Sequence, residues 1–176
     1  MSADLHKAKA RYHEAGATAC RHAVDAVRRQ SGVDFHMREW SRSSELAFDE
    51  QWLPVSRHED GGFDWPKIYS RYREPGTLKP VIWSPGERLS GLFLCTIHGK
   101  SVKLQWLEGD PRENCPLKGF RATIAVETMA VYAQLLGRPE ICLEGVADGV
   151  KPLYIDGYGF TEVIPHKGSS YLKRAV

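Results

Sequence analysis

The segment that decides the fold of this chain runs from Val102 to Val146 and reads VKLQWLEGDPRENCPLKGFRATIAVETMAVYAQLLGRPEICLEGV. Its first part, 102–109, alternates apolar and polar side chains, which is typical of a half-buried strand. Apolar residues then recur at helical spacing over 118–136, and the glycine and proline that follow end the helix. EICLEGV at 140–146 predicts a buried strand. The segment is therefore a strand–helix–strand unit.

The junction between the first strand and the helix, DPRENCPLKGFR at 110–121, is the first candidate site. A helix N-terminus leaves backbone N–H groups unpaired at the positive end of the helix dipole, which suits an anion such as phosphate. The same position is also an ordinary place for a turn. Whether the junction is an anion site or only a turn depends on the secondary-structure elements around it.

Upstream of the unit, two more apolar runs at 79–83 and 88–97 are separated from each other and from 102–109 by the turn sequences SPGE and HGKS. These runs predict an antiparallel three-stranded meander. Downstream, a helix-length gap leads to terminal strands at 158–165 and 169–176. A meander that continues into a strand–helix–strand unit predicts an α/β (α+β) domain. Its sheet should be mixed, mostly antiparallel and twisted, with helices on both faces.

The N-terminal part of the chain looks mainly helical. An apolar stripe over Asp4–Gln30 predicts a long amphipathic helix, whose other face is rich in basic residues. Such a face can bind nucleic acid or simply be solvated. Within the less regular region 33–77, WPKIYSRYR predicts a short helix that begins at Trp65 with Asp64 as its N-cap. The aromatic and basic residues of this region can line a ligand groove or pack over the edge of the core.

Composition narrows the function classes. The 176 residues are enough for one domain with a substantial core. A balance of 24 basic and 22 acidic residues gives a net charge of +2, which argues against a nucleic-acid partner. No apolar run reaches the ~18 residues of a membrane span, and the N-terminal residues lack the apolar core of a signal peptide. Widely spaced cysteines and histidines without ligand spacing predict reduced thiols, no metal site and a cytoplasmic protein.

The second half of the chain resembles the GNAT superfamily of acyl-CoA N-acyltransferases. The resemblance covers about residues 79–176 and rests on the meander, the segment PLKGFRATIAVETMAVYAQLLG, the strand EICLEGV and LYIDGYGF near the end. It implies an N-acyltransferase that moves an acetyl or other acyl group from acetyl-CoA or another acyl-CoA, as co-substrate, to a primary amine by direct attack. The acceptor so implied is a small-molecule or peptide amine, and a homodimer stays open.

The resemblance places the pyrophosphate of coenzyme A at the junction. The family loop reads Gln/Arg-x-x-Gly-x-Gly/Ala, and Pro116–Arg121 stands in its place with only the central glycine matching. Pro116 has no N–H to offer, and Arg121 brings a long side chain where the family has almost none. Lys118 and Arg121 can instead add charge-assisted contacts to the phosphates; the alternative is that coenzyme A binding is lost and the loop only starts a helix. The cofactor-binding residues implied here are Leu117, Lys118, Gly119, Phe120, Arg121 and Ala122.

Two tyrosines compete for the role of general acid. The family commonly has a tyrosine four residues before the glycine of a Gly-Phe pair, where it protonates the leaving thiolate. Here that pair lies at 159–160, and the corresponding position is Ile155. Tyr154 is one residue out of register, and Tyr158 is adjacent to the glycine. Either an additional residue in the short helix restores Tyr154 as the acid, or the acid is missing and Tyr154 is a packed aromatic residue. On the same register, Asp148 takes the position of an asparagine that contacts the pantetheine arm and binds the cofactor.

Acyl transfer also needs a proton acceptor for the amine and a donor to the thioester carbonyl. Glu108 at the end of 102–109 is the first candidate base, with an exposed strand terminus as the alternative, and Glu144 on the next strand is the second. In the family a backbone N–H of the fourth strand holds the carbonyl, which implies Leu107 or Glu108. Cys115, just ahead of the helix, is a candidate nucleophile for a rival covalent mechanism, with a buried bystander thiol as its alternative.

These inferences describe one GNAT-like domain over residues 1–176. Residues 1–78 are expected to form an N-terminal helical part on the acceptor side, and residues 79–176 the sheet and the acyl-CoA-binding part. The altered loop and the displaced tyrosine leave a second interpretation, in which the fold survives as a catalytically degenerate binding or regulatory module.

Overall fold

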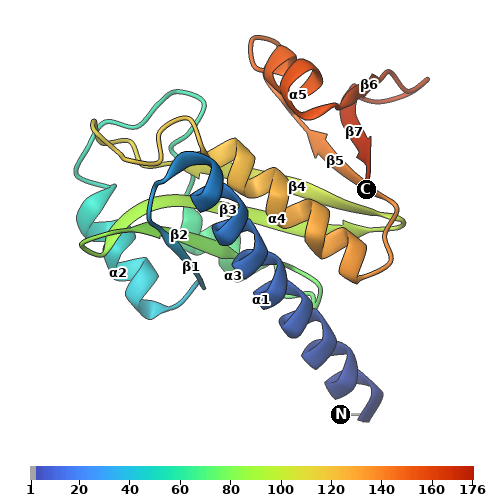
Figure 1. Ribbon diagram of the computed structural model, residues 1–176, viewed down its shortest axis with the longest axis horizontal. Helices are drawn as coiled ribbons and strands as arrows, with labels where there is room; N and C mark the ends of the chain where they lie inside the picture. The colour runs from blue at the N-terminus through green and yellow to red at the C-terminus, as the bar shows by residue number, and fades with distance from the viewer. Residues whose placement is uncertain (1–2) are drawn as a thin grey trace.

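A computed structural model describes residues 3–176 as one mixed sheet of seven strands with five helices (Figure 1). The strands are β1 (His36–Glu39), β2 (Pro80–Ser84), β3 (Arg88–His98), β4 (Ser101–Gly109), β5 (Glu140–Glu144), β6 (Thr161–Val163) and β7 (Tyr171–Ala175). The helices are α1 (Ala3–Ser31), α2 (Arg42–Gln51), α3 (Trp65–Arg71), α4 (Arg121–Leu135) and α5 (Lys151–Tyr158). The strand order is β1-β2-β3-β4-β5-β7-β6, with β4 and β5 parallel and all other neighbours antiparallel. The predicted fold class is confirmed.

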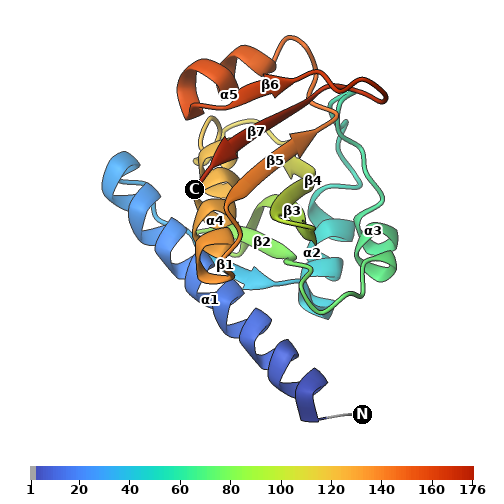
Figure 2. The same ribbon diagram turned by 90° about the vertical axis from the view of Figure 1, so that its right-hand side faces the viewer.

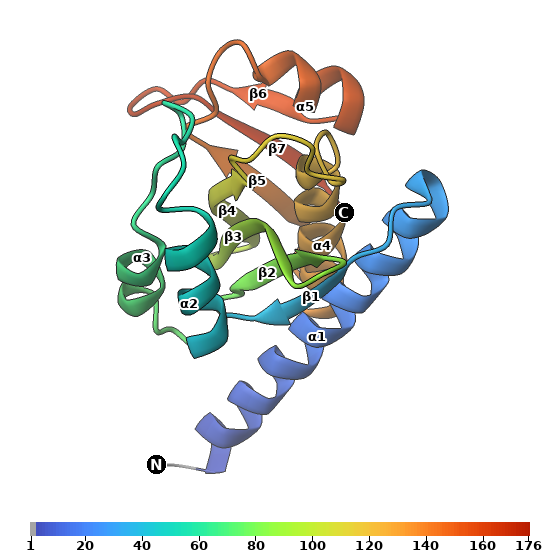
Figure 3. The same cartoon turned by 90° about the vertical axis from the view of Figure 1, so that its left-hand side faces the viewer.

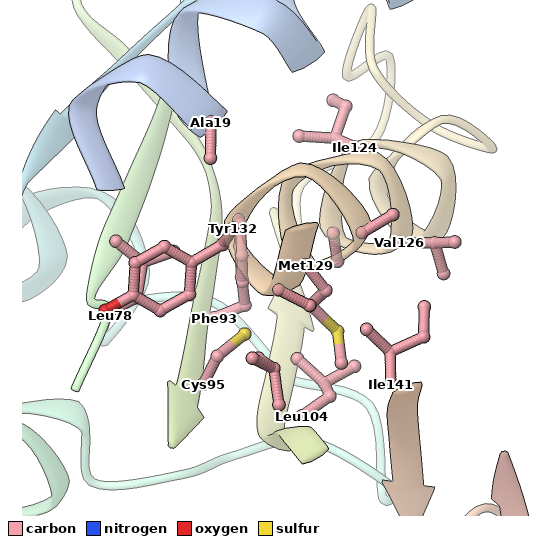
Figure 4. Packing of buried hydrophobic residues seen from close by; sticks show 14 of the residues in the cluster. Ala19, Leu78, Phe93, Cys95, Leu104, Ile124, Val126, Met129, Tyr132 and Ile141 are labelled. Carbon is pink, nitrogen blue, oxygen red and sulfur yellow. The ribbon is translucent and has the colours of Figure 1, made fainter. Parts of the chain in front are cut away.

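α1 and α4 cover one face of the sheet (Figures 2 and 3). The side chains of Ile124, Met129 and Tyr132 on α4 are buried against β3, β4 and β5, and Ala19 of α1 completes this layer (Figure 4). Because α4 is anchored in this way along most of its length, its N-terminal turn is held next to the end of β4. The predicted helix 118–136 therefore exists, but it begins three residues later, at Arg121.

α2 and α3 cover the opposite face over β2, β3 and β4 (Figure 3). Trp52 and Trp65 are fully buried there, and the Trp52 indole Nε1 donates a hydrogen bond to the Leu89 carbonyl at 3.0 Å. These two tryptophans pack in the core rather than line a groove. The Asp64 carboxylate accepts a hydrogen bond from the Lys67 backbone N–H at 3.2 Å, which confirms the predicted N-cap of α3.

The region 33–77 contains more regular structure than its sequence indicates. β1 pairs with β2 at the sheet edge, so the first 78 residues contribute a strand as well as helices. Four residues are too few to show a clear alternation, and the pairing partner that stabilises them lies more than forty positions away. α2 follows after Ser41, whose backbone N–H donates to the Ser44 hydroxyl at 3.3 Å. The two serines in the RSSEL stretch give weak helix propensity, which conceals this helix.

β4 and β5 run side by side only over their first four residues, Ser101–Leu104 and Glu140–Leu143. Within β4 the pairing with β3 skips Gln105, which forms a bulge between Leu104 and Trp106. A bulge bends its strand and increases the local twist. Beyond it, β4 continues with β3 to Gly109 while β5 ends, so the two parallel strands separate at this point.

Within residues 3–176, no helix is long and apolar enough to cross a membrane. The same part of the chain has no group of three His, Cys, Asp or Glu side chains placed to hold a metal ion. All four cysteines are free thiols, and three of them are buried.

Candidate active site

A cleft of about 520 Å³ opens where β4 and β5 separate, and we call it the strand cleft. On the side of α4 and α5 its wall includes Leu107 and Tyr154, which belong to the core of that face. On the other side it is lined by Asp60 and Phe63 from the loop between α2 and α3, and by Trp106 of β4. Its walls come from both faces of the sheet, so two molecules could meet between the strands from opposite sides.

Tyr154, one of the two predicted candidates for the acid, lies in α5 and lines the strand cleft. Its ring packs between those of Tyr158 and Phe160, at centroid distances of 5.8 and 5.9 Å. Burial, together with the neighbouring Tyr158, raises the pKa of Tyr154, so its phenol keeps its proton at neutral pH. The Tyr158 hydroxyl instead shares a hydrogen bond of 2.6 Å with Thr123 on the first turn of α4. The structure thus brings Tyr154 to the cleft and ties Tyr158 to α4.

A second cleft of about 500 Å³, the junction cleft, adjoins the first. It is lined by the end of β4, residues 110–113 of the junction, and the side chains of Lys118 and Arg121. Asp60 and Leu107 line both clefts, so the two clefts are adjacent. Sequence reasoning placed Leu107, Lys118 and Arg121 at the site, and the structure brings these three together.

Arg121 lies against the backbone of Gly109. A Cβ added at Gly109 would lie 2.1 Å from the guanidinium, so only glycine leaves room for this approach. The guanidinium donates one hydrogen bond, to the Asp110 carbonyl at 3.2 Å. Among residues 3–176, no carboxylate forms an ion pair with Arg121 or Lys118. Both cations therefore remain able to pair with an anion in the junction cleft.

The backbone of the junction offers fewer donors than the family loop. The Lys118 N–H donates to the Cys115 carbonyl, and the Phe120 N–H donates to the Leu117 carbonyl, each at 3.0 Å, so both are used inside the turn. The Leu117 side chain is fully buried in the core, and those of Phe120 and Ala122 pack against it. The N–H groups of Arg121, Ala122 and Thr123 form the first turn of α4, where no partner exists within the helix. Gly119 is exposed with φ of 90°, a left-handed conformation that suits glycine.

Glu108 has a different role from the predicted base, and it is not an exposed strand terminus either. Its side chain is 6% exposed, and its carboxylate accepts two hydrogen bonds from the Arg57 guanidinium at 2.8 and 2.5 Å. It also accepts hydrogen bonds from the Gly62 N–H, the Phe63 N–H and the Trp65 indole, at 2.8, 3.4 and 2.7 Å. A carboxylate with five donors has its lone pairs occupied. Glu108 therefore holds the α2–α3 loop to β4 instead of taking a proton.

The positions of two further candidate residues, Asp148 and Cys115, bear on their predicted roles. The Asp148 carboxylate is 95% exposed and pairs with Lys151 at 2.8 Å, a contact that lowers the pKa of Asp148. It faces solvent, whereas its neighbours Ala147 and Val150 line the strand cleft. Cys115 is buried in the core beneath the junction, so the bystander alternative fits and the covalent mechanism does not.

Asp110 organises the junction. Its fully buried carboxylate accepts hydrogen bonds from Arg88 at 2.6 Å and from the Arg112 side chain at 2.8 and 2.9 Å. Burial would raise the pKa of Asp110, but the hydrogen bonds from Arg112 and Arg88 outweigh it and hold that pKa below its ordinary value of 3.8. Asp110 thereby holds the side chain of Arg112, which lines the junction cleft.

We expect Asp110→Asn to lower the free energy of unfolding at neutral pH by about 1.5–3 kcal/mol, because two charged donors lose their charged acceptor. A lowered folded-state pKa contributes stability above the unfolded-state pKa of about 4, and this contribution is lost as the pH falls through the folded value. The difference between wild type and variant should therefore shrink at more acidic pH. Urea unfolding at neutral pH and at about pH 3 measures it, and a difference that stays constant would contradict the assignment.

Several residues at the two clefts were missed by sequence reasoning, chiefly Arg57, Asp60 and Phe63 of the α2–α3 loop. This loop lies more than forty positions from the end of β4. The available signal was the run RHEDGGFDW at 57–65, in which a polar, mostly charged stretch precedes a glycine pair and two aromatic residues follow it. Glycines at a turn permit close approach, and a Cβ at Gly61 would lie 2.7 Å from the Glu108 carboxylate.

Comparison with known proteins places this arrangement in context. No protein-family model matches the sequence, and no curated protein sequence matches it. Solved structures do match. The GNAT domain of S. lividans PAT is 12% identical, with 80% of this chain and 89% of that chain covered and a TM-score of 0.58. The ribosomal-protein-S18-alanine N-acetyltransferase of Escherichia coli is 12% identical over 81% of this chain and 93% of that chain, with a TM-score of 0.53.

A structure that contains coenzyme A is also similar. The PaiA N-acetyltransferase of Thermoplasma acidophilum, solved in complex with coenzyme A, is 14% identical over 81% of this chain and 99% of that chain, with a TM-score of 0.51. The similarity spans nearly the whole of that chain, and identities this low establish the fold alone. The chain has the fold of the GNAT superfamily of acyltransferases.

Proposed function

We propose that this protein is an acyl-CoA-dependent N-acyltransferase that transfers an acyl group, with acetyl as the first to test, to a primary amine by direct attack. The observation that carries the proposal is the strand cleft, which lies where two parallel strands separate and adjoins a cleft lined by the cations Lys118 and Arg121. A thioester with a phosphorylated tail matches that combination in a GNAT fold. Residues 1–78 supply the loop on the acceptor side, and residues 79–176 supply the acyl-CoA side.

Coenzyme A would be held mainly by side chains. Lys118 and Arg121 would contact its pyrophosphate, together with the first-turn N–H groups of α4, because an anion at a helix N-terminus also interacts favourably with the dipole. The pantetheine arm and the acyl group would extend past Leu107 toward Tyr154. Backbone N–H groups in the turn at 115–120 are already hydrogen-bonded inside the turn and cannot contact the phosphates. The Arg121 guanidinium, which packs against Gly109, would replace part of that contact.

The reaction would proceed in the strand cleft. The amine nitrogen attacks the thioester carbon, a backbone N–H of Leu107 or Glu108 stabilises the carbonyl oxygen, and the carbon–sulfur bond breaks. Tyr154 donates its phenolic proton to the departing thiolate. Glu144 lines the cleft at the end of β5 with its carboxylate bonded to Lys103, and it is positioned to take the proton that the attacking nitrogen loses.

Calorimetric titration with coenzyme A and acetyl-CoA tests the proposal. Lys118→Ala and Arg121→Ala should each weaken binding by about tenfold, because each removes one charge-assisted phosphate contact. Lys67→Ala on α3 is the matched control, since Lys67 is exposed on the other face of the sheet. Unchanged affinity in both junction variants would show that the phosphates lie elsewhere.

A second candidate function follows from the altered junction itself. Pro116 lacks an N–H, and the N–H groups of Lys118 and Phe120 are used inside the turn, so the loop has fewer donors than a typical pyrophosphate loop. These features fit a binding or regulatory module without acyltransferase activity. Absence of any binding heat with millimolar coenzyme A and acetyl-CoA would favour the module over the enzyme.

A further inference from the structure

We propose that the acceptor is an aliphatic primary amine that carries a second positive charge, as in an α,ω-diamine. This proposal rests on the proposed acyltransferase function and names the substrate class of the same cleft. Two charged residues, Asp60 and Glu144, line the strand cleft, and both are acidic. They come from opposite walls, Asp60 from the α2–α3 loop and Glu144 from the end of β5.

The two carboxylates are in different states. Glu144 is bonded to Lys103 and its side chain is 47% exposed, so it is fixed at the point where the attacking amine would lie. Asp60 is 70% exposed, and the nitrogen nearest to its carboxylate within ion-pair distance is the imidazole Nδ1 of the exposed His58, at 3.5 Å. An ammonium group in the cleft can therefore reach Asp60 without displacing a buried ion pair. A dication has one group for each carboxylate, whereas a monoamine leaves Asp60 unused.

Two aromatic rings line the same cleft as Asp60. Phe63 and Trp106 lie 4.9 Å apart between ring centroids at an angle of 68°, and both are partly exposed in the cleft. The Trp106 indole donates to the Tyr72 hydroxyl at 3.4 Å, and the Phe63 carbonyl accepts from Arg57 at 2.8 Å, so both rings are positioned in advance. Aromatic faces attract ammonium groups and do not attract carboxylates.

The two clefts also differ in charge along the proposed reaction path. The junction cleft is lined by the cations Lys118 and Arg121 together with the carboxylate of Glu113, Glu144 lines only the strand cleft, and Asp60 lines both clefts where they adjoin. A dicationic acceptor is attracted to the strand end and repelled from the phosphate end. An acceptor with a carboxylate in place of its second amine would be repelled by Asp60 and drawn toward the wrong cleft.

Three acceptors with the same four-carbon chain provide the test: 1,4-diaminobutane, n-butylamine and 4-aminobutanoate, each assayed with acetyl-CoA by release of the coenzyme A thiol. We expect kcat/KM for the diamine to exceed that for butylamine by about tenfold, from one charge-assisted contact and one cation–π contact, with 4-aminobutanoate the poorest. Asp60→Asn should reduce the ratio of diamine to butylamine by about fivefold or more. Glu59→Gln removes the same charge at the exposed neighbouring position and should leave that ratio within about twofold.

Calorimetric binding of diaminobutane and butylamine, with and without coenzyme A, gives a readout that does not depend on turnover. Tighter binding of the diamine, weakened in Asp60→Asn and in Phe63→Leu, supports the proposal. Equal or better use of butylamine or 4-aminobutanoate overturns it and leaves the acyltransferase intact. If coenzyme A fails to bind, the proposed function fails, but preferential diamine binding would still support the cation site, and no diamine binding would overturn it as well.

Discussion

Glu108→Gln should lower the free energy of unfolding by about 3–5 kcal/mol, the largest stability effect that we expect from a single charge-neutralising substitution in this protein. The variant keeps the size of the side chain but leaves the Arg57 guanidinium, which is 11% exposed, without its anion. It also turns an amide N–H₂ group toward a ring of donors, so at least one buried donor loses its acceptor. Removing one partner of a buried pair costs more than the pair itself contributes.

The measurement is equilibrium unfolding in urea, together with thermal melting. For a domain of this size the loss corresponds to a fall in Tm of roughly 6–20 °C. Glu87→Gln is the matched control, because the Arg38–Glu87 pair also joins distant parts of the chain but is 53% and 66% exposed. It should change stability by less than about 1 kcal/mol. Equal effects of the two substitutions would contradict the assigned role of Glu108.

A local readout distinguishes loss of the loop anchor from general destabilisation. The backbone N–H groups of Gly62 and Phe63 both donate to Glu108. In Glu108→Gln their hydrogen exchange should accelerate more than that of β3 amides at the centre of the sheet. The loop also carries Asp60 and Phe63 into the strand cleft, so the same variant should weaken acceptor binding more than coenzyme A binding.

The case of Glu108 shows why sequence predicts an element better than the role of a residue in it. The strand 102–109 has a local signal, and β4 occupies Ser101–Gly109. The partners of Glu108, however, lie at positions 57–65, in a loop whose path is set by the packing of α2 and α3. A carboxylate at a strand end looks alike in sequence whether it is a base, an exposed terminus or a buried anchor. Long-range contacts alone decide among these.

The junction was located correctly because its signals are local. A strand that ends at a glycine, a proline-containing turn and a helix with continuous apolar spacing are all visible within 102–136. The sequence could not reveal that Arg121 fits over Gly109, because that contact depends on the angle at which α4 leaves β4. The bulge at Gln105, which opens the strand cleft, likewise has no signature in the alternating pattern of β4.

Tyr154→Phe should reduce kcat for acyl transfer by about 10²-fold or more, which is the low end of what a positioned general acid contributes. Phenylalanine keeps the ring that packs between Tyr158 and Phe160, so the affinity for coenzyme A should stay within about twofold. The loss should therefore fall on kcat and leave binding nearly unchanged. Steady-state kinetics, with calorimetry of coenzyme A binding on the same preparations, measures both.

Tyr158→Phe is the matched control, and the pH profile is the second readout. Removing the Tyr158 hydroxyl breaks its bond to Thr123, which should cost about 1 kcal/mol of stability and change kcat by less than about threefold. Because burial raises the pKa of Tyr154 above its ordinary value of 10.0, the protonated acid persists through neutral and moderately alkaline pH. In the wild type, kcat should therefore show no loss from ionisation of this acid below about pH 10. An unaffected kcat in Tyr154→Phe, or a loss confined to Tyr158→Phe, would move the acid to Tyr158 or remove it from the mechanism, and the thiolate would then leave unassisted.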